Sequence, residues 1–127
     1  MSDPLVYALR VQPRAARDIE NHLLRLEQIA GPEAALAWRE GILTAIGSLS
    51  HTPRRCARIP EQARFRHETR QLLYRRTPTG PAWRLLFTVT GEEQGASDPP
   101  TVHLLHIRHA AERPLTTTDA RALESRE

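Results

Sequence analysis

The feature that constrains this chain most is a pair of helical stripes separated only by Gly31-Pro32. Apolar residues recur at spacings of three and four over residues 14–30 and again over residues 33–49. Helices of about 17 residues are about 25 Å long, and so short a connection requires them to lie antiparallel. The sequence therefore predicts a helical hairpin. Its stripes are Ala16, Ile19, Leu23, Leu26 and Ala30, then Ala35, Trp38, Ile42, Ala45 and Leu49.

Strand patterns lie on both sides of the predicted hairpin. Residues 5–11 precede it, and residues 69–75, 82–90 and 101–108 follow it, separated by a Pro- and Gly-rich turn at 77–81 and a polar loop at 91–100. Thr116, followed three residues later by Asp119, predicts a capping box and a short C-terminal helix or tail from about residue 116. The predicted fold class is α+β: an antiparallel β-sheet packed against the hairpin, in the order β-α-α-β-β-β.

Length and composition favour one cytoplasmic domain over residues 1–127. A domain typically takes about 100–200 residues. The chain is 39% hydrophobic and 26% charged, which is ordinary for a soluble globular protein. No apolar run approaches the roughly 18 residues of a membrane span, and residues 1–6 do not resemble a signal peptide. The single cysteine, Cys56, cannot form an internal disulfide, which fits a reducing compartment. We therefore expect no membrane partner.

The positive charge is concentrated in the middle of the chain. Residues 51–84 hold nine Arg and two acids, whereas residues 1–50 hold five Arg and six acids, and residues 85–127 hold four Arg and seven acids. A local basic cluster focuses electrostatic potential even when the net charge, +3 here, is small. The clustering predicts a polyanionic or acidic partner.

Histidine and cysteine patterns do not predict a metal site or a cofactor. His103, His106 and His109 lie on one predicted strand, where alternation puts 103 and 109 on one face and 106 on the other. No Cys pair or His-Glu-x-x-His motif accompanies them. Cys56 has arginines beside it but no identifiable base partner, so we interpret it as a small packing residue.

The strand arginines are the remaining candidates for a functional site. Arg84 lies between Trp83 and Leu85 in an alternating strand, so its side chain points to the opposite face from these apolar residues. If the apolar face packs on the hairpin, Arg84 is expected on the sheet face that the hairpin leaves uncovered. Arg70 lies within the preceding strand, and Arg108 and His109 end the last one. Two interpretations stay open: a solvated sheet face, or a phosphate-binding surface with a titratable imidazole at its rim.

Five segments, in this order, resemble the RelE/ParE superfamily of toxins from type II toxin–antitoxin modules. They are PRAARDIENHLLRL, ILTAIGSLSHTP, HETRQLLY with Arg70, WRLLFTV with Arg84, and VHLLHIRHAAERPL. The resemblance covers nearly the whole chain, from Val6 to Leu115. The RelE/ParE-like fold, an antiparallel sheet carrying a helical hairpin, agrees with the fold predicted from the patterns alone.

The resemblance implies two alternative activities. RelE-like members cleave mRNA on the ribosome. If this chain has that activity, the resemblance implies that its catalytic residues are Arg84, Arg70 and His109. ParE-like members instead inhibit DNA gyrase, and both branches are neutralised by a cognate antitoxin protein. The resemblance implies these further phosphate- or partner-binding residues: Arg66, Arg75, Arg108 and Arg113.

Two differences between this sequence and the RelE-like nucleases favour the ParE branch. Residues 115–120 contain no aromatic side chain, so the C-terminal tyrosine of the best-studied nucleases has no counterpart. The two predicted helices are also long, as in ParE-like members. We therefore expect a gyrase-inhibiting toxin, with a ribosome-dependent mRNA endoribonuclease as the alternative and a member with neither activity as a third possibility; whether the chain is an enzyme stays open.

Overall fold

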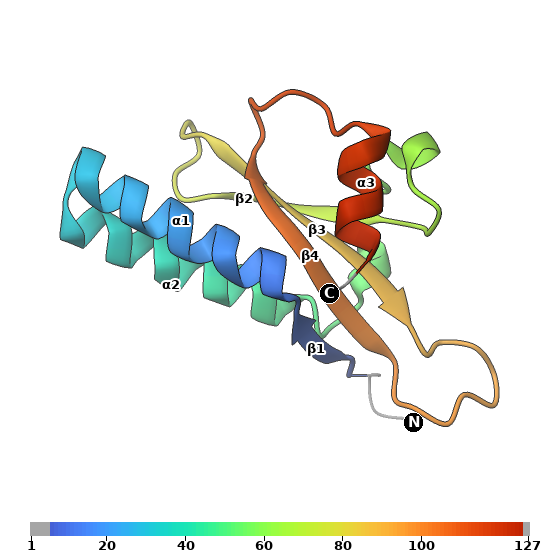
Figure 1. Cartoon of the computed structure of the whole chain (residues 1–127). Helices are drawn as coiled ribbons and strands as arrows, with labels where there is room; N and C mark the ends of the chain where they lie inside the picture. Colours follow the sequence, from blue (N-terminus) through green and yellow to red (C-terminus); the bar gives the residue numbers. More distant parts are fainter. Residues whose placement is uncertain (1–5, 126–127) are drawn as a thin grey trace.

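A computed structural model of the chain describes residues 6–125. The elements follow the predicted order (Figure 1). They are β1 (Ala8–Val11), α1 (Pro13–Ala30), α2 (Pro32–Ser48), two 3-10 turns (Pro53–Arg55 and Gln62–Arg64), β2 (Arg70–Arg75), β3 (Ala82–Thr90), β4 (Thr101–His109) and α3 (Thr117–Glu124). The predicted α+β class is confirmed, and the capping box formed by Thr116 and Asp119 begins α3 as expected.

The four strands form one sheet in the order β1-β4-β3-β2. β3 pairs antiparallel with both β2 and β4, but β1 pairs parallel with β4 over four residues. The sheet is therefore mixed, whereas the sequence predicted an antiparallel one. Parallel neighbours need a long crossover connection, and the hairpin with β2 and β3 supplies it.

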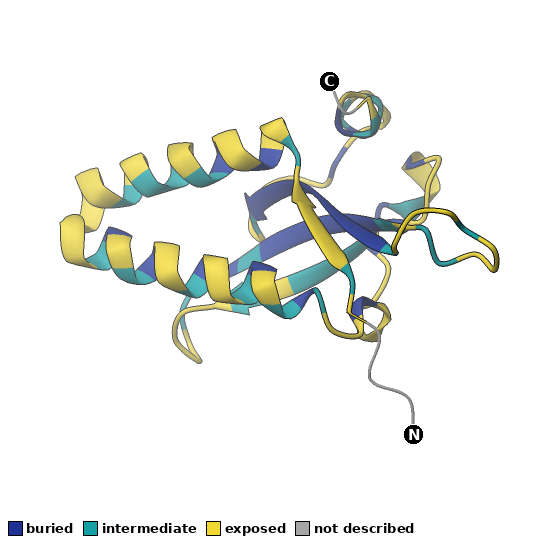
Figure 2. Cartoon of the chain, turned by 90° about the horizontal axis from the view of Figure 1, so that it is seen from below, coloured by how far each residue is buried: buried dark blue, intermediate teal, exposed yellow. Residues whose placement is uncertain are grey.

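The helical hairpin begins and turns at residues that suit those positions. Pro13 and Pro32 occupy the first helical positions, where a missing N–H costs nothing. Gly31 joins the helices with a φ of 92°, a conformation that favours glycine. The far end of the hairpin, around this glycine, projects beyond the sheet (Figures 1 and 2).

The predicted stripe of α2 is confirmed by the burial of Trp38 and Ile42, whereas that of α1 is only partly correct. Ala16 and Ala30 are exposed, and Ala15 and Asp18 are the buried residues of α1. Ala30 is exposed because it lies at the projecting tip of the hairpin.

Both faces of the sheet are covered, as the continuous burial of β4 in Figure 2 indicates. The hairpin packs on one face, which we call the hairpin face. On the other, the α3 face, α3 and residues 59–65 fold over the strands. The expectation of an uncovered face is wrong, because Ile59 and Phe65, from the irregular segment between α2 and β2, supply apolar anchors there. The hairpin face holds two apolar clusters, Ala15, Trp38, Ile42, Ile46, Leu85, Leu104 and Ile107, and Leu49, Cys56, Phe87 and Val102. The α3 face holds Ile59, Phe65, Leu86, Leu115, Ala120 and Leu123.

A β-bulge shifts the register between β3 and β4. Leu86 pairs with His106 but Phe87 pairs with Leu104, so β4 has one extra residue there. His103 and His106 consequently share the α3 face, and His109, which pairs with Trp83, lies on the hairpin face. The predicted grouping of His103 with His109 is therefore wrong, because simple alternation does not anticipate a bulge.

Helix α1 completes the edge of β4 where β1 ends. The Ile107 N–H donates to Asp18 Oδ2 at 3.0 Å, and the Ile107 carbonyl lies 3.1 Å from His22 Nε2. The backbone of β4 is thus satisfied by side chains of α1 rather than by a strand. Within residues 6–125, no helix is long and apolar enough to cross a bilayer.

Candidate functional site

Arg84 lies on the α3 face in a buried ion pair with Glu61. Its Nη1 and Nη2 donate to the two carboxylate oxygens of Glu61 at 2.9 and 2.7 Å. Its Nε donates to Gln71 Oε1 at 2.6 Å. Only 9% of the Arg84 side chain and 4% of the Glu61 side chain is exposed. Arg84 therefore lies on a covered face of the sheet, whereas the sequence predicted an uncovered one.

The environment of Glu61 keeps it ionised. Burial alone would raise its pKa, but hydrogen bonds from Arg84 and from the Leu115 N–H outweigh burial and lower the pKa to about 2. The Glu61 carboxylate thus neutralises Arg84 at neutral pH and also anchors the chain just before α3. With one hydrogen bond on each of the three guanidinium nitrogens, Arg84 keeps only the second N–H of Nη1 and of Nη2 for another acceptor, and its charge is already balanced by Glu61.

Arg108 stands directly opposite Arg84 across β3 and β4. Its Nη2 donates to the Arg113 carbonyl at 2.6 Å, and its nearest carboxylate, Glu112, is 3.8 Å away. Its Nε is buried and makes no hydrogen bond within residues 6–125. Burial lowers the pKa of Arg108; Glu112 opposes this effect, and the charge of Arg84 adds to it. Arg108 is therefore a buried cation with incomplete compensation.

A small polar cavity of about 170 Å³ lies beside Arg108. Under it, His106 Nδ1 lies 2.6 Å from Asp18 Oδ2, and Arg14 Nε donates to Asp18 Oδ1 at 3.2 Å. Burial opposes ionisation of Asp18, but the hydrogen bond and charge of His106 outweigh it and lower the pKa of the Asp18 carboxyl. Sequence reasoning missed this pair, because Asp18 lies outside the predicted stripe of α1 and its partner is 88 positions away.

Arg70 lies on the hairpin face, where it pairs with Phe87. Its Nη2 is 2.8 Å from Glu68 Oε1, and its Nη1 donates to the Cys56 carbonyl. Glu68 also pairs with Arg54 and Arg58. Arg70 therefore holds the 53–58 segment against the sheet edge.

His109 also lies on the hairpin face, beside Trp83, with ring centroids 5.2 Å apart. Its Nδ1 accepts a hydrogen bond from the Ala111 N–H at 3.0 Å. The partners of His109 and Arg70 on β3, Trp83 and Phe87, are four residues apart, or about 13 Å along a strand. The structure thus separates the three residues of the nuclease hypothesis: Arg84 is on the α3 face, and Arg70 and His109 lie apart on the other.

The four further candidate arginines also do not converge. Arg113 donates to Asp119 at 2.7 Å, and Arg75 donates to the Gly80 carbonyl at 2.6 Å. Arg66 is exposed, and its backbone N–H donates to Glu124 Oε2. Only Arg108 and Arg113 are neighbours, through the hydrogen bond to the Arg113 carbonyl.

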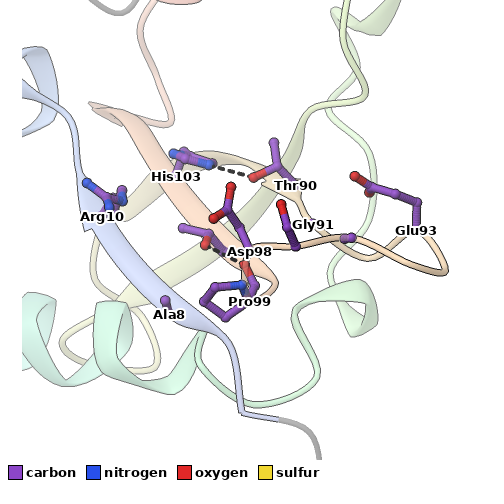
Figure 3. A pocket seen from close by; sticks show the side chains of 11 residues that line it. Ala8, Arg10, Thr90, Gly91, Glu93, Asp98, Pro99 and His103 are labelled. Atoms are coloured by element: carbon purple, nitrogen blue, oxygen red, sulfur yellow. Dashed lines mark hydrogen bonds between the residues drawn. The ribbon is translucent and has the colours of Figure 1, made fainter.

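A polar cleft of about 370 Å³ lies where β1 and the 91–100 loop meet the sheet (Figure 3). Thr90 Oγ1 is 2.8 Å from His103 Nε2 on its wall, and Arg10 and Asp98 also line it. No local pattern predicts this cleft, because residues 8–10 and 90–103, which form it, are far apart along the chain. Residues 6–125 contain no group of three or more His, Cys, Asp or Glu side chains suited to a metal ion.

Cys56 is buried against Leu49, Phe87 and Val102. Burial raises the pKa of its thiol, although Arg55 and Arg70 act in the opposite direction. The interpretation of Cys56 as a small packing residue is confirmed.

Comparison with solved structures identifies the fold. The chain is similar to a chain of the chromosomal ParDE TA system from P. aeruginosa, with a TM-score of 0.59 and 20% sequence identity. The match covers 82% of this chain and 96% of that one. The RelE/ParE-like fold expected from the resemblance is therefore confirmed. No protein-family model matches the sequence, and no curated protein does.

Proposed function

We propose that this chain is the toxin of a type II toxin–antitoxin module, of the ParE-like kind, and that it arrests growth by binding and inhibiting DNA gyrase. A cognate antitoxin encoded beside it neutralises it. We favour the ParE-like branch over the RelE-like branch because Arg84 and His109 lie on opposite faces of the sheet.

An RNA-cleaving site requires its groups to act on one phosphate. A general base or acid must lie within hydrogen-bond reach of the reacting atoms, and the cations must face the charge that develops there. The charge of Arg84 is instead balanced by Glu61, its Nε is bound to Gln71, and His109 Nδ1 is occupied by a backbone N–H. This arrangement supports a toxin that works by binding.

A binding toxin needs an accessible contact surface, and the hairpin offers one. Large apolar side chains on exposed helical positions are typical of protein interaction sites when they gather on one element. The exposed large apolar residues of the two helices are Leu24, Ile29, Leu36 and Leu43.

The basic middle segment supports an acidic antitoxin. Several of its arginines are already paired with Glu61, Glu68 and Glu92. Arg66 and Arg76 are exposed, and their side chains make no ion pair within residues 6–125. These two guanidinium groups are free to attract acidic side chains.

Expression of the chain, alone or with the adjacent open reading frame, tests the proposal. Alone it should stop bacterial growth, co-expression should restore growth, and a version truncated by an early stop codon is the control. Mapping mRNA 5′ ends in the arrested cells separates the branches. Intact mRNA supports gyrase inhibition; cleavage at ribosome-bound codons would establish the nuclease alternative, and normal growth at verified soluble expression would reject a toxin role.

A further inference from the structure

An aromatic cluster joins the hairpin to one end of the sheet. The Trp83 ring lies 4.6 Å from His22, 5.3 Å from Trp38 and 5.2 Å from His109, measured between ring centroids. Every one of these contacts is edge-to-face, with interplanar angles between 64° and 72°. Trp38 is buried, whereas Trp83 is half-buried, so one indole of the cluster is accessible.

A cavity of about 410 Å³ opens against this cluster. Its volume is within the roughly 300–1,000 Å³ of small-molecule sites. Helix α1 and the segment after β4 supply its sides, and β3 supplies the indole. Its lining residues are His22, Arg25, Trp83, His109, Ala111 and Glu112.

The two imidazoles of the cavity have defined hydrogen-bonding roles. Because His22 Nε2 faces the Ile107 carbonyl, an acceptor, that nitrogen carries the proton, and Nδ1 is an acceptor in the neutral ring. His109 Nδ1 accepts the Ala111 N–H, so its Nε2 carries the proton and is a donor. The cavity thus has one ring acceptor and one ring donor.

Two charged residues complete the lining, and both retain hydrogen-bonding capacity. Glu112 Oε2 accepts the His109 N–H at 2.8 Å, and Oε1 accepts no hydrogen bond within residues 6–125. Arg25 makes neither a hydrogen bond nor an ion pair with any residue in that range. The residues that line the cavity therefore carry aromatic rings and four polar groups, two donors and two acceptors, and one of the acceptors, Glu112 Oε1, also lies 3.8 Å from Arg108 Nη2.

We propose that this cavity binds the base of a purine mononucleotide. A purine stacks on Trp and His rings and presents donors and acceptors on its edges, which match Glu112 Oε1, His22 Nδ1 and His109 Nε2. Arg25 is the group that meets the phosphate. The site is distinct from the gyrase and antitoxin contacts proposed above and does not depend on them.

Other occupants fit the same observations less well. A bare cation would gain from the aromatic rings and Glu112, but Arg25 repels it. An aromatic side chain of a peptide would fill the volume and leave the four polar functions without partners. A pyrimidine offers a smaller stacking surface and lacks the imidazole edge of a purine.

Tryptophan fluorescence measures this binding directly, because the chain has two tryptophans and both belong to the cluster. We expect AMP and GMP to quench the fluorescence saturably, and UMP to bind at least about tenfold more weakly. Ribose 5-phosphate, which lacks a base, should leave the emission unchanged. Purine nucleotides without effect at millimolar concentration would overturn the proposal, and equal quenching by ribose 5-phosphate would contradict recognition of the base.

Calorimetric titration of variants with a purine nucleotide tests where the base binds. Glu112→Gln replaces one carboxylate oxygen with a donor on an exposed residue, and we expect it to weaken purine binding about tenfold. Glu40→Gln makes the same change at an exposed position of α2 and should have no effect. Trp83→Leu should abolish binding, with circular dichroism used to verify the fold. Unchanged affinity in Glu112→Gln, together with unchanged affinity in folded Trp83→Leu, would place the ligand elsewhere and overturn the proposal.

Discussion

The two faces of the sheet are closed by different chemistry. On the hairpin face, apolar side chains of α1 and α2 meet Leu85 and Ile107. On the α3 face, a smaller apolar cluster lies beside the Arg84–Glu61 pair and the cation of Arg108. The hairpin face is therefore held mainly by removal of apolar surface from water, and the α3 face by matched charges as well.

Because the two faces are held by different interactions, their stability should respond differently to mutation and to pH. Burial of apolar groups does not depend on protonation, whereas a buried ion pair is stable only while both partners are charged. Removing one partner leaves the other charge buried and alone. Stability measurements on matched variants of the two faces test whether the faces differ in this way.

The largest effect is expected for Arg84→Ala. It leaves the buried Glu61 carboxylate without its cation, so the free energy of unfolding at pH 7 should fall by about 3–5 kcal/mol. Urea denaturation measures the change, and the exposed Arg75→Ala is the matched control, expected within about 0.5 kcal/mol of wild type.

The double variant Arg84→Met with Glu61→Met sharpens this result, because it removes both charges. It should recover more than half of the loss, since replacing a whole buried pair is often close to neutral. A single variant as stable as wild type would show that Arg84 and Glu61 are solvated in solution.

Ile42→Ala probes the hairpin face. Deleting a fully buried Ile side chain should cost about 3 kcal/mol, because the lost burial adds to the cavity left behind. The loss should be the same at pH 7 and pH 3.5, whereas that of Arg84→Ala should shrink at the lower pH as Glu61 becomes easier to protonate. A parallel pH response of both variants would remove the distinction between the faces.

Wild-type stability should decrease in acid because of Glu61. Its pKa is lowered from 4.5 to about 2 in the folded chain, so its contribution is fully present above pH 4.5 and is lost as the pH falls toward 2. A shift of this size corresponds to about 3 kcal/mol. In Glu61→Gln this acid-dependent portion should disappear from urea titrations at a series of pH values; an unchanged pH profile would assign the acid sensitivity to other carboxyls.

Thr116→Ala should have the smallest effect. It removes the Thr116 half of the capping box, in which its Oγ1 accepts the Asp119 N–H at 3.1 Å, and should cost about 1 kcal/mol. Hydrogen exchange should increase mainly in α3, because this helix is short and lies at the end of the chain. Faster exchange throughout β3 and β4 would mean instead that α3 is essential for the whole sheet.

Local patterns predicted the elements well, because a helical stripe or an alternating strand is written in neighbouring residues. The hairpin, β2, β3, β4 and the capping box of α3 were all found in this way. Three features were not: the parallel pairing of β1, the extra residue Leu105 in β4, and the cover that residues 59–65 place over the α3 face. Each depends on contacts between distant segments.

The candidate site was the less predictable part for the same reason. Arg84 was singled out correctly as an unusual strand residue, but its partner Glu61 lies 23 positions earlier in a segment without periodicity. Asp18 and His106 lie 88 positions apart, so nothing local pairs them. The catalytic role of Arg84, Arg70 and His109 stays a prediction of the resemblance, which their separation in the fold does not favour.

The most direct test of the central claim is a supercoiling assay with purified DNA gyrase, relaxed plasmid and increasing amounts of this protein. We expect supercoiling to be inhibited in a dose-dependent way, and we expect prior addition of the cognate antitoxin to prevent the inhibition. Undiminished supercoiling at saturating amounts of a protein that arrests growth in cells would contradict the account.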